Sequence, residues 1–90
     1  MSPKQSNQHP SLDDAILLAA QTHLRDRDKY GQPYILHPLR VMFRLETEIE
    51  RIVGVLHDVV EDSLGKPHEV TCAMLRQMGY SDEIVQAWIA

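Results

Sequence analysis

Four ionisable side chains lie close together in the segment LHDVVED, residues 56–62. In a helix, His57 lies one turn before Glu61 and Asp58 lies one turn before Asp62, so each pair shares a face. An imidazole and a carboxylate together suit Mn²⁺, Fe²⁺ or Zn²⁺ better than Ca²⁺. The pattern therefore indicates a metal site in which His57 and Asp58 bind the ion. Glu61 and Asp62 would reach the metal-bound water and accept its proton as nucleophilic attack begins.

The same segment also fits an interpretation without a metal. HDxxED can form a solvated acidic edge, with His57 at its boundary and Asp62 near the helix end. Acidic side chains in the last turn of a helix oppose its macrodipole, and a bound cation would offset that mild cost. From these residues alone, both interpretations stay open.

A second segment, KYGQPYILHPLRV at residues 29–41, supplies a further histidine. Pro33 and Pro38 restrict the backbone on either side of His37 and help to fix the direction of its imidazole. A lone histidine before a helix is more often a cap or a packed side chain than a ligand. Because the HDxxED segment follows some twenty residues later, His37 becomes a candidate third ligand.

The elements that must position these motifs are predicted to be helices, in an all-α, five-helix bundle. Ser11 is a candidate N-cap for a first helix over about residues 12–26. Pro38 suits the first turn of a second helix, with His37 just ahead of it. Thr47 and Glu50 match a capping box, which predicts a third helix that begins near residue 48 and runs to about residue 62.

Two shorter helices are predicted after the HDxxED segment. Gly79 fits the position just past the end of a fourth helix, and Ser81 fits the N-cap of a fifth. The fifth helix is still apolar at residues 88–90. This predicts either that its end packs against something, such as another copy of the chain, or that the sequence is the front part of a longer fold. No segment shows sustained alternation of apolar and polar residues, so no strand is expected.

The composition limits the classes of partner. Ninety residues predict one domain, which we expect to span residues 11–90 after a disordered lead-in at residues 1–10. Nine basic and thirteen acidic residues give a net charge of −4, which argues against nucleic-acid binding. The single cysteine, Cys72, cannot form an intrachain disulfide. Without a signal-peptide pattern or a long apolar run, we expect a cytoplasmic protein that does not bind a membrane.

Taken together, the two motifs resemble those of the HD-domain metal-dependent phosphohydrolases. The matching residues are DKxGxPYIxHPxRV at residues 28–41 and LHDVVEDS at residues 56–63, and the resemblance extends from about Ala15 to Trp88. The branch that the chain resembles most is the alarmone hydrolases, which are the hydrolase domains of RelA/SpoT-type proteins and their small stand-alone relatives. This resemblance implies a hydrolase that removes pyrophosphate from a phosphorylated nucleotide such as (p)ppGpp.

The resemblance also implies a role for individual residues. It makes His37, His57 and Asp58 the metal ligands, usually for Mn²⁺. It gives Glu61 and Asp62 the positioning and deprotonation of the attacking water. Lys29 and Tyr34 are expected to bind substrate, Lys29 near its phosphates. His23 matches a recurrent histidine of the first helix that is not a ligand, and we expect it to have a structural hydrogen-bonding role.

The sequence departs from the family pattern in two places. Asp28 stands where the alarmone hydrolases carry an arginine that stacks on guanine, although Arg25 and Arg27 are near. The family also takes its last metal ligand from an aspartate on a later helix, which this sequence does not include. The alternative function is therefore a shortened HD module that binds metal or nucleotide, or that oligomerises, without turnover. A homo-oligomer is expected, in which a second chain could lend the missing carboxylate.

Overall fold

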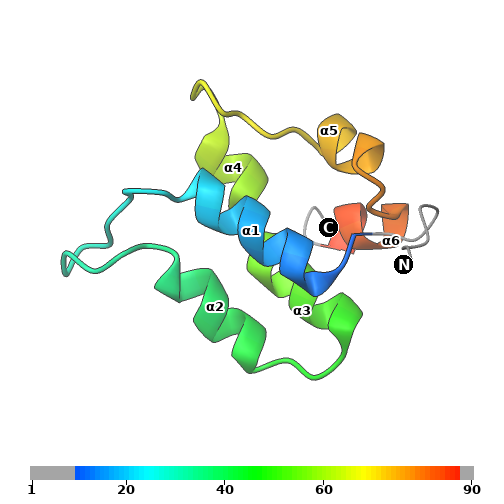
Figure 1. The fold of residues 1–90 in the computed structure, drawn as a ribbon, viewed down its shortest axis with the longest axis horizontal. Coiled ribbons are helices and arrows are strands. Elements are labelled where there is room, and N and C mark those ends of the chain that lie inside the picture. The colour runs from blue at the N-terminus through cyan, green and yellow to red at the C-terminus, as the bar shows by residue number, and fades with distance from the viewer. Residues whose placement is uncertain (1–9, 88–90) are drawn as a thin grey trace, which may run out of the picture.

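The computed structural model describes residues 10–87, which form helices joined by loops (Figure 1). Within that range there is no strand, and a single isolated bridge joins Arg27 to Pro33. The all-α prediction is confirmed. The lead-in expected over residues 1–10 falls almost wholly outside the described residues, as do the apolar residues 88–90. The helices are α1 (Leu12–Thr22), α2 (Leu36–Phe43), α3 (Glu48–Leu56), α4 (Val59–Ser63), α5 (Cys72–Gln77) and α6 (Asp82–Ala87).

Two helices begin at capping boxes, where the sequence predicts an N-cap at Ser11 and a capping box at Thr47 and Glu50. At α1, the Ser11 hydroxyl accepts a hydrogen bond from the Asp14 N–H at 3.2 Å, and the Asp14 carboxylate accepts one from the Ser11 N–H at 2.9 Å. At α3, Thr47 and Glu50 exchange the same pair of bonds at 3.1 and 3.3 Å. Each box satisfies backbone donors that have no partner inside the helix.

The first helix is shorter than predicted, because it ends at Thr22 instead of near residue 26. His23 caps its C-terminus. Arg25 has a φ of 70°, in the left-handed region that non-glycine residues seldom adopt, so the chain leaves the helical path there. The loop that follows returns toward the bundle at Tyr34, whose N–H donates to the Asp26 carbonyl at 2.8 Å.

The helix predicted over about residues 48–62 is instead divided into α3 and α4. His57 caps the end of α3, and Asp58 is the residue before α4. Asp58 has φ −104° and ψ 0°, close to the sparsely populated bridge region between the helical and extended conformations. The division therefore falls between the two adjacent residues expected to bind metal.

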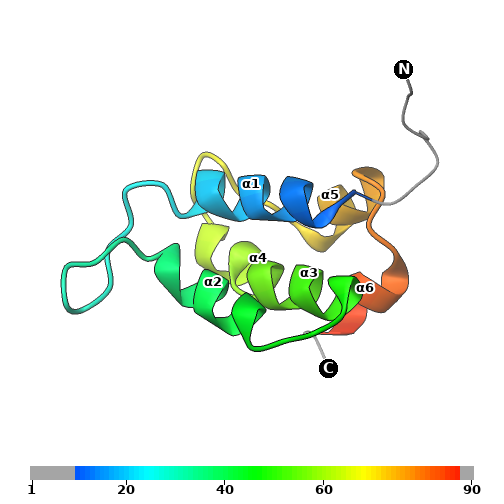
Figure 2. The same cartoon turned by 60° about the horizontal axis from the view of Figure 1, so that its bottom comes forward.

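Helix α3 is the centre of the packing. Helices α1, α2 and α6 all contact it, and α1 also contacts α4. Figure 2 shows α1 over the row that α2, α3 and α4 form. Ile52, Val55 and Leu56 of α3 are fully buried, and each such side chain stabilises the fold by roughly 1.5–3 kcal/mol relative to an exposed one. The remaining core residues are Ala15, Ala19, Met42, Val59, Val70, Leu75, Tyr80, Ile84 and Val85.

The helix lengths also bear on membrane association. No helix within residues 10–87 combines the length and the apolar character that crossing a bilayer requires.

Candidate metal centre

The division between α3 and α4 turns two neighbouring side chains toward one point. In a continuous helix, adjacent residues point about 100° apart and do not face each other. Here the turn at residues 57 and 58 brings the Nε2 of His57 to 3.3 Å from the Oδ2 of Asp58. The local change in the backbone thus places two side chains that are adjacent in the sequence next to each other in space.

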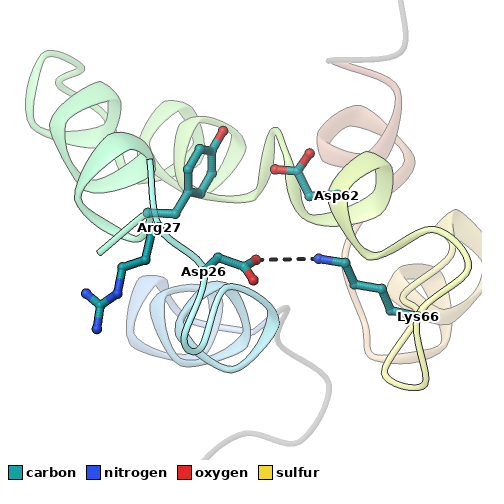
Figure 3. A pocket seen from close by; sticks show the side chains of 5 residues that line it. Asp26, Arg27, Asp62 and Lys66 are labelled. Atoms are coloured by element: carbon teal, nitrogen blue, oxygen red, sulfur yellow. Dashed lines mark ion pairs between the residues drawn. The ribbon is translucent and has the colours of Figure 1, made fainter. Parts of the chain in front are cut away.

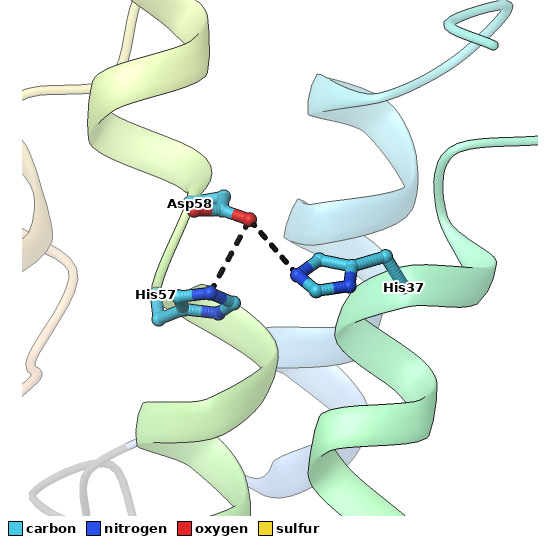
Figure 4. Close-up of side chains that lie close together, drawn as sticks. All are labelled: His37, His57 and Asp58. Atoms are coloured by element: carbon cyan, nitrogen blue, oxygen red, sulfur yellow. Dashed lines mark ion pairs between the residues drawn. The ribbon is translucent and has the colours of Figure 1, made fainter. Parts of the chain in front are cut away.

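The third predicted ligand reaches the same point from α2. The Nε2 of His37 lies 3.5 Å from Oδ2 of Asp58 (Figure 4). The centres of the His37 and His57 rings are 5.4 Å apart. His37 is the second residue of α2 rather than the residue just ahead of it, and α2 packs directly on α3. Ligand atoms from all three residues lie within 4.8 Å of one another. The structure therefore brings together His37, His57 and Asp58.

The hydrogen bonding of His57 is compatible with a metal ion at this point. Its Nδ1 lies 3.0 Å from the Gly54 carbonyl oxygen, an acceptor, so Nδ1 carries the proton. A neutral ring then presents the bare lone pair of Nε2 to the Asp58 carboxylate, and two lone pairs repel at that distance. Either a second proton on His57 or a metal ion between the side chains removes the conflict.

The donor set and its spacing also fit a divalent ion. Two imidazole nitrogens and one carboxylate oxygen suit Mn²⁺, Fe²⁺ or Zn²⁺. Neighbouring ligands about 2.1 Å from one ion are about 3.0–3.4 Å apart. The spacings of 3.3 and 3.5 Å from Asp58 to the two imidazoles are close to this range. A hydrogen bond from the far nitrogen of a ligating histidine to a backbone carbonyl is typical of metal sites.

Tyr34 supports the carboxylate of this group. Its hydroxyl donates to Oδ2 of Asp58 at 2.9 Å, and its ring lies 5.6 Å from the ring of His37. Burial raises the pKa of Tyr34, and the carboxylates of Asp58 and Asp62 raise it further, so the hydroxyl keeps its proton. The predicted contact of Tyr34 with substrate stays a prediction.

The two carboxylates predicted to act on water differ in their surroundings. Asp62 is half-buried on α4, whereas Glu61 is exposed. Burial raises the pKa of Asp62, and the neighbouring charge of Asp58 adds to the increase. Asp62 therefore holds a proton more readily than an ordinary aspartate does.

An open cleft of about 280 Å³ adjoins this group, lined by Asp26, Arg27, Tyr34, Asp62 and Lys66 (Figure 3). Across it, Nζ of Lys66 lies 3.5 Å from the Oδ2 of Asp26. Asp26 and Lys66 belong to no motif that the sequence singles out as functional. The sequence around Lys66 indicates only the end of a helix. Nothing in it indicates that Lys66 contacts Asp26, forty positions earlier.

The loop between α1 and α2 carries Lys29 on its exposed surface. The Nζ of Lys29 lies 5.4 Å from the centre of the Tyr30 ring, and Lys29 is not among the residues that line the cleft. Asp28 has a structural role in this loop, because its carboxylate accepts hydrogen bonds from the N–H groups of Tyr30 at 2.8 Å and Gln32 at 2.9 Å. These bonds lower the pKa of Asp28, the bond from Gln32 having the largest effect. The predicted contact between Lys29 and phosphate stays a prediction.

Sequence comparison relates the chain to RelA/SpoT family proteins. It is 35% identical over 78 residues to a GTP pyrophosphokinase of Myxococcus xanthus, a match that covers 77% of this chain and 10% of that protein. It is 32% identical over 71 residues to a guanosine-3′,5′-bis(diphosphate) 3′-pyrophosphohydrolase of Borreliella burgdorferi, covering 74% of this chain and 11% of that protein. The chain spans about a tenth of the length of these curated relatives. No family model matches the chain.

Proposed function

We propose that the chain is an HD-type module that binds a divalent cation, Mn²⁺ in the first instance, and removes pyrophosphate from a phosphorylated nucleotide. The observation that carries the proposal is the convergence of His37, His57 and Asp58 from two separate helical segments on one point. The relationship to a guanosine-3′,5′-bis(diphosphate) 3′-pyrophosphohydrolase supports the choice of reaction.

On this proposal, one set of residues binds the cation and another accepts the proton of the attacking water. A bound cation lowers the pKa of a water molecule in contact with it and polarises a phosphoryl oxygen. Asp62 takes the proton of the attacking water onto its carboxylate, a role that suits its raised pKa. Glu61 is more exposed, and its part in orienting the water rests on the resemblance of LHDVVED to the family motif.

The cleft would hold the part of the substrate that is not being cleaved. Its lining includes Asp62, the proposed base, and Tyr34, whose hydroxyl donates to the proposed ligand Asp58. Lys66 and Arg27 add positive charge to its lining, which suits a phosphate group. On this proposal Lys66 contacts a phosphate of the substrate while its ammonium group stays beside the Asp26 carboxylate.

The proposal is tested by the release of pyrophosphate from guanosine 3′,5′-bis(diphosphate) in the presence of Mn²⁺. We expect Asp62→Asn to lower the turnover by a factor of at least about 100, since general base catalysis contributes roughly 10²–10⁴. Glu83→Gln, which removes an exposed carboxylate from α6, is the matched control and should keep the wild-type rate.

Two outcomes would overturn the proposal in different ways. If Asp62→Asn turns over as fast as the wild type, Asp62 is not the base. If the wild type binds Mn²⁺ tightly and releases no pyrophosphate, the chain is a binding module instead of a hydrolase.

A further inference from the structure

The His23 side chain is fully buried, and neither of its ring nitrogens has a hydrogen-bond partner in the described part of the chain. A buried polar atom without a partner destabilises the folded state. An apolar residue of similar size would avoid this cost at the C-terminal end of α1. Stability alone therefore does not account for a histidine at this position.

Two carboxylates lie just beyond hydrogen-bond distance of one nitrogen of this ring. Nδ1 is 3.8 Å from an oxygen of Asp26 and 4.0 Å from an oxygen of Asp62, both of which line the cleft. Burial lowers the pKa of His23 more than the carboxylates of Asp62, Asp26 and Asp58 raise it, so the ring is neutral near pH 7. A neutral imidazole has one N–H, and the two carboxylates compete for it.

Lys66 settles this competition in favour of Asp62. Its ammonium group already lies 3.5 Å from the Asp26 carboxylate that faces His23. In the described residues, Asp62 has no lysine or arginine within ion-pair distance, and the Nδ1 of His23 lies 4.0 Å from its Oδ2. A second metal site here is disfavoured, because Lys66 brings a positive charge to the same group.

We propose that His23 is a positioning residue that donates an Nδ1–H hydrogen bond to Asp62 and holds its carboxylate toward the attacking water. The bond requires the two groups to approach by about 1 Å, to the usual N–H···O distance. The functional part of this inference rests on the proposed hydrolysis, whereas the hydrogen bond itself does not. The two parts can therefore be tested separately.

The hydrogen bond is tested by ¹⁵N NMR of the histidine rings in the metal-free protein. We expect the Nδ1–H tautomer for His23, with a ring resonance that moves more in Asp62→Ala than in Asp26→Ala. An Nε2–H tautomer, or a larger change in Asp26→Ala, would overturn the proposal. This measurement leaves His23 in place, so it does not depend on whether variants of His23 fold.

The positioning role is tested by a pair of substitutions that differ in where they place a donor. Asparagine puts an amide N–H near the position of Nδ1, whereas glutamine puts it near Nε2. We expect His23→Asn to keep kcat within a few-fold and His23→Gln to lower it about tenfold, the size of effect expected for one lost hydrogen bond. The KM for guanosine 3′,5′-bis(diphosphate) and the affinity for Mn²⁺ should change little in either variant.

A control separates this role from the general effect of changing a buried residue. Thr22→Val removes the hydroxyl that donates to the Leu18 carbonyl at 2.9 Å, at the same end of α1, and should leave kcat unchanged. If His23→Asn and His23→Gln lose equal activity, the positioning role is wrong. If the wild type shows no turnover, the proposed hydrolysis has failed, and the NMR measurement alone decides the inference.

Discussion

At the scale of single residues, the site is organised around one carboxylate oxygen. Oδ2 of Asp58 lies 2.9 Å from the Tyr34 hydroxyl, 3.3 Å from the Nε2 of His57 and 3.5 Å from the Nε2 of His37. The tyrosine hydroxyl donates a hydrogen bond to this oxygen, but an imidazole can donate one only if its Nε2 is protonated. The proposed cation would give both imidazoles and the carboxylate a common partner.

The first prediction concerns the tyrosine. Tyr34→Phe removes the hydrogen bond that orients Asp58, and loss of such a supporting bond typically weakens metal affinity by about 10–100-fold. Calorimetric titration with Mn²⁺ measures the effect. Tyr30→Phe removes the same hydroxyl from a side chain that is 77% exposed at the loop, and it should bind Mn²⁺ as the wild type does. Equal affinity in the wild type and both variants would exclude Tyr34 from the site.

The second prediction concerns the pH dependence of stability. Burial lowers the pKa of His23 below the ordinary value of 6.5. As the pH falls below that value, the unfolded chain takes up a proton that the folded chain does not, so the free energy of unfolding decreases. Thermal unfolding of the wild type should therefore lose more Tm between about pH 7.5 and about pH 5.5 than that of His23→Asn, which lacks this group.

The opposite result would arise if charge outweighs burial. The carboxylates of Asp26, Asp58 and Asp62 face His23 and raise its pKa, whereas Lys66 lowers it. A wild type that gains Tm relative to His23→Asn on acidification would show that the carboxylates prevail. The pKa of His23 in the folded chain would then lie above its ordinary value, and the single-donor argument for His23 would lose its support.

At the scale of the helices, the ends that depend on local chemistry were predictable. Ser11, Thr47 and Ser81 cap α1, α3 and α6 as their sequence context indicates. Gly79, with a φ of 107°, follows the end of α5, and its N–H donates to the Arg76 carbonyl at 3.0 Å. These features need only a few neighbouring residues, so the sequence carries them directly.

The division between α3 and α4 was not predictable in the same way. Val59 and Val60 continue the apolar stripe of α3, so the periodicity indicates one helix through residue 62. No proline or glycine marks a break at His57 or Asp58. At the interruption, Asp58 accepts a hydrogen bond from Tyr34, a tertiary contact that a local pattern cannot show.

A third prediction follows from the close packing of α2 on α3. A Cβ added at Gly54 would lie 2.8 Å from Cδ1 of Leu45 and 3.3 Å from Cγ1 of Val41. Gly54→Val should therefore push the two helices apart, lower the free energy of unfolding by about 1–3 kcal/mol and separate His37 from His57. Chemical denaturation measures the first effect, and Mn²⁺ titration measures the second.

A substitution in a loop provides the comparison for Gly54. Gly65 has a φ of 79° and open space around its Cα, so Gly65→Ala strains the backbone without altering the spacing of α2 and α3. It should lose stability and keep its affinity for Mn²⁺. If Gly54→Val also binds Mn²⁺ with wild-type affinity, the spacing of the helices does not set the site.

At the scale of the whole molecule, the proposed functional region is formed by two sets of contacts between segments that are far apart in the sequence. Residues from α2 and from the α3–α4 junction form the proposed metal group, and loops after α1 and after α4 meet across the cleft. The family resemblance predicted the first set of contacts, because its motifs include all three proposed metal ligands. It did not predict the ion pair between Lys66 and Asp26. Both residues lie outside the metal-ligand set, and their contact depends on how the loops pack.

The central claim is that this arrangement binds a divalent cation, and the most direct test is thermal unfolding with and without Mn²⁺. At a concentration 100 times the dissociation constant, the ion should raise the free energy of unfolding by about 2.7 kcal/mol. For a domain of this size that corresponds to an increase in Tm of about 10 °C or more. The increase should persist in His68→Ala, whose histidine contacts the Thr22 carbonyl outside the group, and disappear in His57→Ala. An equal increase in the wild type and His57→Ala, or none in the wild type, would contradict the claim.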